Sequence, residues 1–83
     1  MSDLLTSIIE TYDEEEFLLA DGFDEAIIGV ETKTMRLIYS YMKCIKILEY
    51  QGMEREEAIE FFEFNTIDAY VGDKTPIWAE DFF

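Results

Sequence analysis

The sequence contains no histidine, one cysteine and one proline, and only six of its 83 residues are Lys or Arg. Without histidine there can be no Ser-His-Asp triad, no Cys-His pair and no imidazole ligand for zinc. A single cysteine cannot build a structural zinc site either. There is also no phosphate-binding glycine loop of the GxGxxG or GxxxxGK[ST] type. We therefore expect a protein that is not an enzyme and that uses no cofactor.

The charge is strongly one-sided. Twenty acidic residues face six basic ones, which gives a formal net charge of −14. That sign opposes direct binding to nucleic acid and to an anionic membrane surface, and no apolar run is long enough to span a bilayer. Apolar residues nevertheless make up 49% of the chain and aromatic residues 16%, which is too much for a disordered acidic tail. The chain is predicted to fold.

The lone Cys44 lies among apolar neighbours and cannot form an internal disulfide. The expected state is a buried free thiol in a reducing cytoplasm. The N-terminal residues 1–5 lack the positive charge that begins a signal peptide, which agrees with a cytoplasmic location.

The chain length predicts one small domain over residues 1–83. Residues 3–12 have helical spacing of apolar side chains, and Ser2 or Asp3 could cap that helix. The following acidic run suggests a second short helix over residues 13–22, with a single kinked helix over residues 3–20 as the alternative. Either way, the first twenty residues could form a separately docked helical segment.

Two apolar stretches, Ala26–Glu31 and Met35–Tyr39, read as strands joined by the short polar link Thr32–Thr34. Ile77–Ala79 reads as a short last strand, and Pro76 before it suits a sheet edge. The predicted fold class is α+β. A small antiparallel sheet, made of the hairpin and the C-terminal strand, would carry two or three helices packed on one face.

A helix is predicted over residues 41–50, with Ser40 as its N-cap and Gly52 closing it. Another is predicted over residues 54–63, with acidic residues on its outer arc and an inner arc of Ala58, Ile59, Phe61 and Phe62. Phe64 would fall on the acidic side if that helix continued. Residues 65–72 are ambiguous between a further helical turn and a loop.

Three blocks of the sequence look familiar. They are GFDEAIIG at 22–29, YMKCIKIL at 41–48 and GMEREEAIEFFEFNT at 52–66, followed by AYVG at 69–72 and TPIW at 75–78. In these blocks the chain resembles a widespread group of small, mostly uncharacterised proteins encoded by phages and prophages. The resemblance implies a setting in the host bacterial cytoplasm during infection. Small acidic phage proteins often bind host proteins, so the implied partner is a host defence or nucleic-acid-handling protein with a basic surface.

The acidic residues are the candidate partner-binding site: Asp13, Glu14, Glu15, Glu16, Asp21, Asp24, Glu25, Glu56, Glu57, Glu60 and Glu63. On a helix, carboxylates three or four residues apart have Cβ atoms about 5–6 Å apart. DNA carries a phosphate about every 3.4 Å of axis on each strand. Glu56, Glu60 and Glu63 would thus form a row that could imitate DNA in a basic channel. The simpler interpretation is a solvated helix face.

Two other functions stay open. One is a structural or assembly module that self-associates through aromatic surfaces, although most aromatic side chains are expected in the core: Phe61, Phe62, Phe64, Tyr70 and Trp78. The other is a small-molecule or metal-binding protein. Asp21, Asp24 and Glu25 do not match the spacing of an EF-hand loop, so no specific metal site is predicted.

Overall fold

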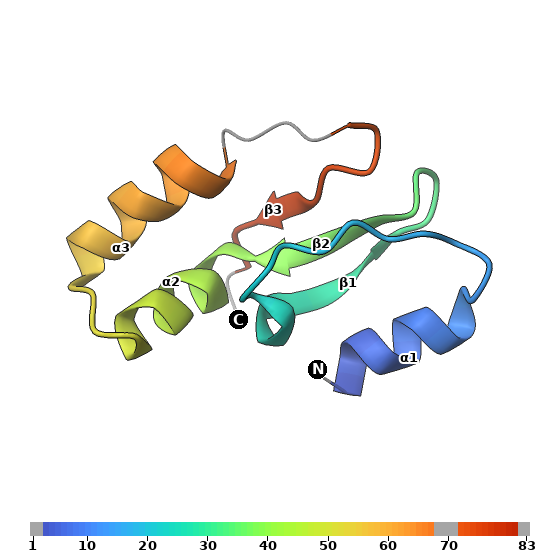
Figure 1. Cartoon of the computed structure of the whole chain (residues 1–83), viewed down its shortest axis with the longest axis horizontal. Coiled ribbons are helices and arrows are strands. Elements are labelled where there is room, and N and C mark those ends of the chain that lie inside the picture. Colours follow the sequence, from blue (N-terminus) through green and yellow to red (C-terminus); the bar gives the residue numbers. More distant parts are fainter. Residues whose placement is uncertain (1–2, 68–71, 82–83) are drawn as a thin grey trace.

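A computed structural model describes residues 3–67 and 72–81 of the chain. Three α-helices and three strands are joined by two short helical turns (Figure 1). In chain order they are α1 (Asp3–Thr11), η1 (Asp24–Ala26), β1 (Ile27–Glu31), β2 (Arg36–Ser40), α2 (Tyr41–Tyr50), α3 (Arg55–Phe62), η2 (Glu63–Ile67) and β3 (Ile77–Ala79). The α+β class predicted from the sequence is confirmed.

The sheet has the order β1-β2-β3 and is mixed. The hairpin of β1 and β2 is antiparallel as expected, whereas β3 pairs with β2 in parallel, with Ile38 opposite Ile77 and Ser40 opposite Ala79. The expectation of a wholly antiparallel sheet was therefore wrong for the third strand. The chain leaves β2 through α2 and α3 before it returns, and such a long crossover permits parallel pairing.

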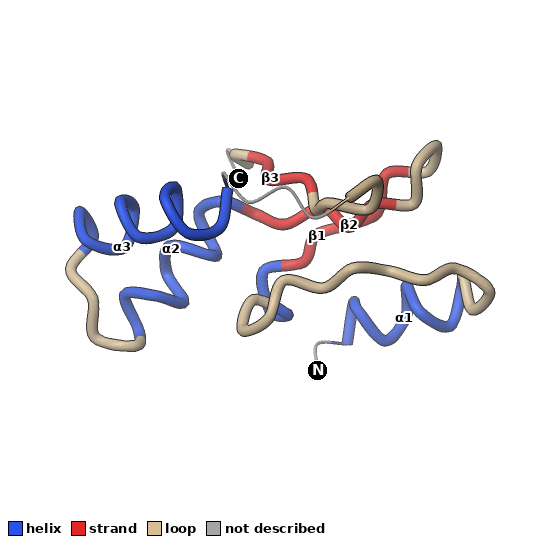
Figure 2. Tube along the Cα trace, turned by 45° about the horizontal axis from the view of Figure 1, so that its top comes forward, coloured by secondary structure: helices blue, strands red, loops and turns tan. Residues whose placement is uncertain are grey.

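The molecule is elongated, with extents of 39 × 25 × 22 Å. In Figure 2, α1 and the segment that follows it lie along one side of the sheet, while α2 and α3 lie side by side beyond its end. Leu5 and Ile8 of α1 belong to the same buried cluster as the strands and α2. Within the described ranges, no helix is long and apolar enough to cross a membrane.

Local signals set the hairpin and α2 as predicted. The register of β1 against β2 shifts between Ile27 and Gly29, so the ladder of the hairpin is irregular at this point. Ser40 caps α2, because its hydroxyl accepts a hydrogen bond from the Lys43 backbone N–H at 3.1 Å. At the other end Gly52 has φ +108°, and the N–H groups of Gly52 and Met53 donate to the carbonyls of Glu49 and Leu48. Glycine adopts this left-handed conformation without the steric cost that a side chain adds.

The hairpin turn contains a carboxylate that the sequence pattern did not reveal. Glu31 accepts hydrogen bonds from the backbone N–H groups of Lys33, at 2.6 Å, and Thr34, at 2.8 Å. The bond from the Thr34 backbone is the main reason why the pKa of Glu31 lies below its ordinary value. Its negative charge therefore stabilises the turn that joins β1 and β2.

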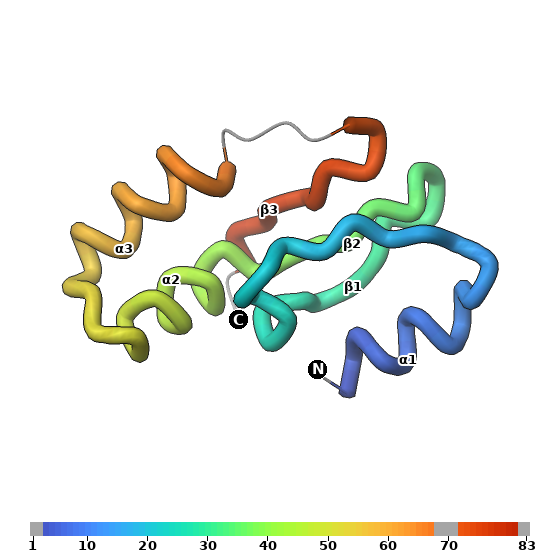
Figure 3. Tube along the Cα trace, viewed as in Figure 1, coloured from blue at the N-terminus to red at the C-terminus, as the bar shows by residue number. Residues whose placement is uncertain are grey.

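Residues 13–22 are not helical, and both helical predictions for this region were wrong. After α1 the chain turns at residues 12–15 and then runs extended along the sheet to η1 (Figure 3). The backbone N–H of Ala20 donates to the Tyr39 hydroxyl at 2.8 Å, and Phe17 and Ala20 pack on the core. These tertiary contacts outweigh the local helix signals. Asp3 is the first helical residue of α1, and Ser2, the other predicted cap, lies outside the described residues.

Aromatic side chains from four parts of the chain meet at Phe62. Its ring centroid lies 5.4 Å from that of Phe23, 5.6 Å from Tyr41 and 5.1 Å from Trp78, all with edge-to-face geometry. Tyr39 contacts Trp78 in turn, at 5.0 Å. Each such pair adds about 0.5–1.5 kcal/mol beyond simple burial. This cluster joins η1, α2, α3 and β3 into one core.

Candidate protein-binding surface on helix α3

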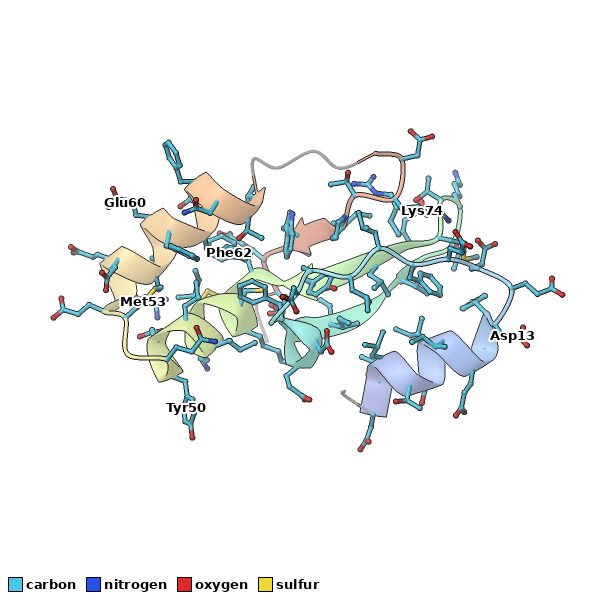
Figure 4. All side chains as sticks on the ribbon, viewed as in Figure 1. Asp13, Tyr50, Met53, Glu60, Phe62 and Lys74 are labelled. Carbon is cyan, nitrogen blue, oxygen red and sulfur yellow. The ribbon has the colours of Figure 1, made fainter. Side chains whose placement is uncertain are left out.

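Helix α3 lies at one end of the molecule and packs mainly against α2. Only Ala58 and Phe62 are buried along its length, and Ile59 is half-buried. Figure 4 shows Phe62 directed into the molecule, whereas Glu60 projects away from it. The remaining side chains of the helix face solvent, while its buried side packs against α2.

We call this surface the α3 face. It comprises five glutamates and two phenylalanines, all exposed: Glu54, Glu56, Glu57, Glu60, Glu63, Phe61 and Phe64. The predicted row of Glu56, Glu60 and Glu63 is present, and all three border one hollow on this surface. Glu57 borders the neighbouring hollow, so the four predicted glutamates of this helix lie together.

Phe64 is the residue that the sequence analysis misplaced. We expected it in the core, yet 80% of its surface is exposed, and Phe61 of the expected inner arc is 42% exposed. The sequence did contain a signal for the exposure of Phe64, because a helix that continues past Phe62 places Phe64 among the glutamates. The chain does continue in that way, since α3 passes into the π-helical turn η2. Phenylalanine is among the residues enriched in the cores of protein interfaces, so Phe64 is a candidate binding anchor.

Two open hollows flank a ridge formed by Glu56, Glu60 and Phe64. The first, of about 680 Å³, is also bordered by Glu54, Glu57, Phe61 and Asn65. The second, of about 400 Å³, is also bordered by Ile59 and Glu63. Each hollow therefore combines apolar surface with several carboxylates, and none of its described lining residues is Lys or Arg.

The charges of the α3 face are unevenly placed for helix stability, because Glu56 and Glu57 lie in the first turn, where the helix dipole favours them, and the later glutamates do not. Glu56 and Glu60 are one helical turn apart, and such like-charged pairs destabilise a helix. Glu60 and Glu63 also lie near the C-terminal end of the helix, where its dipole disfavours negative charge. The one base of the helix, Arg55, pairs with Glu49 of α2 at 3.6 Å. Stability alone does not explain this arrangement.

One glutamate of the α3 face is tied to the neighbouring helix. The Tyr41 hydroxyl donates a hydrogen bond to Oε2 of Glu63 at 3.2 Å. The pKa of Tyr41 lies above its ordinary value, mainly because the phenol is partly buried and also because Glu63 is negatively charged. The phenol therefore keeps its proton and remains a hydrogen-bond donor.

The other predicted acidic residues do not extend this surface. Asp13 and Glu60 lie at opposite ends of the long axis (Figure 4). Asp13–Glu16 form the turn after α1, where Glu15 pairs with Lys74 at 3.4 Å. Asp21, Asp24 and Glu25 lie at or just before η1. The predicted acidic set is thus divided among separate regions.

The lone thiol and the grouping of possible metal ligands also bear on the chemistry of the described part of the chain. Cys44 is fully buried, and burial raises the pKa of its thiol to about 12, so no thiolate forms near neutral pH. Among residues 3–67 and 72–81, no three Cys, Asp or Glu side chains are grouped so that they could hold a metal ion. Tyr70, which we expected in the core, lies outside these ranges.

Comparison with known proteins adds no family or relative. No protein-family model, no curated protein and no solved structure matches the chain.

Proposed function

We propose that this chain is a non-enzymatic binding protein that docks through the α3 face on a basic surface of another protein. The observation that carries the proposal is the 80% exposure of Phe64 within a group of glutamates. Carboxylates around the site would attract a basic partner and speed association, and the aromatic side chain would supply apolar contact once it is docked.

The resemblance to phage-encoded proteins supports a more specific version of this proposal. The partner would be a protein of the bacterial host, engaged in defence or in handling nucleic acid, and binding would inhibit or modulate it. A protein that holds nucleic acid has a basic channel, and a row of carboxylates can occupy it in place of phosphates. DNA would then compete with this chain for the partner.

The test is affinity capture from lysate of the bacterial host, comparing the natural chain with the triple variant Glu56→Lys, Glu60→Lys and Glu63→Lys. A partner captured by the natural chain is purified, and its affinity for both forms is measured by calorimetry. We expect the variant to bind more than about tenfold more weakly, because it sets like charges against a basic surface. High salt and added DNA should both weaken the natural complex.

A matched control distinguishes the effect of the α3 face from the effect of net charge. The triple variant Asp13→Lys, Glu14→Lys and Glu16→Lys changes the net charge by the same amount at the opposite end of the molecule. This control variant should bind the partner with nearly the affinity of the natural chain. Equal loss in both variants, with the fold intact by circular dichroism, would mean that overall charge and not the α3 face determines binding.

Self-association is a second candidate, because Phe64 is as available to another copy as to a partner. Two α3 faces meeting directly would bring their glutamates together, which opposes this contact. Sedimentation velocity over a hundredfold range of concentration distinguishes the two. A concentration-dependent dimer that Phe64→Ala abolishes would favour self-association, and a constant monomer would favour the binding protein.

A further inference from the structure

The two hollows of the α3 face have the same chemical construction. Glu56, Glu60 and Phe64 belong to both, so the Phe64 side chain borders the first hollow on one side of the ridge and the second on the other. In the first hollow Phe61 adds a second aromatic surface, and in the second Ile59 adds an aliphatic one. Each volume exceeds the roughly 150 Å³ that admits a benzene ring.

A hollow of this kind fits a side chain that is cationic at its tip and apolar or planar along its length. Lysine and arginine both bury an aliphatic stem while their charge stays in water. Arginine has two further properties that match the lining. Its planar guanidinium stacks on aromatic rings, and its fork of N–H donors pairs with carboxylates in two directions at once. Lysine acts as a compact, strongly hydrated point charge.

We propose that each hollow receives an arginine side chain of the partner, so that two arginines of one partner straddle the ridge with Phe64 between them. This inference rests on the proposed function and narrows the partner to a protein segment that presents a pair of arginines. Phosphate mimicry by charge alone would not distinguish arginine from lysine. The Phe64 ring, by stacking, and the carboxylates, by bidentate pairing, would both favour arginine.

The test uses three synthetic Gly/Ser peptides of equal length that differ at two positions. These positions hold two arginines, two lysines or two citrullines, the last being the uncharged analogue of arginine. Each peptide is titrated into the full-length ¹⁵N-labelled protein and followed by NMR. The arginine peptide should bind about threefold to tenfold more tightly than the lysine peptide, the range expected for one stacked guanidinium. The citrulline peptide should bind more weakly than both.

Two variants locate the effect. Phe64→Ala should reduce the preference for arginine, because stacking on the ring is lost while bidentate pairing with the carboxylates remains. Glu56→Gln combined with Glu60→Gln should weaken both charged peptides. The shifted signals should come from α3 and η2, while those of the hairpin turn at residues 32–35 stay in place. Asp13→Asn combined with Glu14→Gln, in the distant turn, should change neither affinity.

Several outcomes would overturn this inference. They are equal affinity for the arginine and lysine peptides, a preference that is undiminished in Phe64→Ala, shifts centred away from α3, or no binding of either charged peptide at millimolar concentration. None of these touches the proposed function, which depends on the charge-reversal experiment with the captured partner. Loss of the partner in that experiment, together with equal peptide affinities, would leave an acidic binding surface that is not selective for arginine.

Discussion

The two sides of helix α3 use the same residue type in opposite ways. Phe62 is completely buried and contacts three aromatic rings, whereas Phe64, two residues later, is 80% exposed among glutamates. The inner side is where the free energy of folding is gained, and the outer side includes the like-charged pair Glu56 and Glu60, which opposes the helix. Phe62 and Phe64 are equally hydrophobic. Their positions on the helix therefore decide that Phe62 stabilises the fold and that Phe64 is available for binding.

The largest expected effect comes from exchanging the two phenylalanines for alanine in turn. Phe62→Ala should lower the free energy of unfolding by about 3–5 kcal/mol, because it empties the centre of the aromatic cluster. Phe64→Ala should change it by less than about 0.5 kcal/mol, as exposed substitutions do. Urea denaturation followed by circular dichroism measures both. Similar losses in the two variants would mean that Phe64 is a packing residue and would remove the contrast between the two sides.

The base on which α3 rests can be weakened without touching α3. Ser40 is fully buried at the junction of β2 and α2, where its hydroxyl caps the helix and donates to Asp81 at 2.5 Å. Ser40→Ala should cost about 1–3 kcal/mol, since it removes the cap and leaves a carboxylate without its donor. Partner affinity at low temperature, where the variant remains folded, should be unchanged. Weaker binding by the folded variant would show that the packing around Ser40 affects the α3 face.

The buried side should also respond to alkaline pH. The thiol of Cys44 has its pKa raised from 9.0 to about 12 in the folded protein. Above pH 9 the unfolded chain therefore loses this proton while the folded chain keeps it, so stability falls as pH rises, by up to about 1.4 kcal/mol per pH unit. Burial also raises the pKa of Tyr39 from 10.0, which adds to the decline at higher pH.

The Cys44→Ala variant isolates this thiol. It should be less stable than the natural chain at pH 7, because the sulfur packs in the core, yet its stability should fall less between pH 8 and pH 10. Urea denaturation at a series of pH values gives both slopes. Parallel slopes in the two proteins would mean that the thiol does not cause the alkaline decline.

Local signals predicted the elements on which α3 rests, and long-range contacts decided the rest. The hairpin link at Thr32–Thr34, the Ser40 cap and the Gly52 stop each act within a few residues, so the sequence revealed them. The extended path before η1 depends on Tyr39, nineteen residues beyond Ala20. The parallel direction of β3 likewise depends on a whole crossover. Neither has a local signature.

The candidate site likewise had parts that local signals predicted and parts that depended on long-range contacts. The acidic row of α3 was predictable because helical periodicity places Glu56, Glu60 and Glu63 on one side. Its separation from Asp13–Glu16 was not, because it depends on how the ends of the chain are arranged. The exposure of Phe64 depended on whether the helix continued past Phe62, and η2 settled that.

The smallest expected effect is the sharpest probe of the outer side. Glu60→Gln removes a charge that is repelled by Glu56 one turn earlier and leaves Glu56 in the first turn, where the helix dipole favours it, so the free energy of unfolding should rise by about 0.2–0.5 kcal/mol. The same variant should bind the partner more weakly. Thermal unfolding at low salt, where surface charges are least screened, measures the first effect, and calorimetry measures the second. A variant that is both more stable and weaker in binding would identify Glu60 as placed for recognition at the expense of the fold. A variant that loses stability would mean that Glu60 supports the helix, and the two sides of α3 would then differ in their phenylalanines and not in their charges.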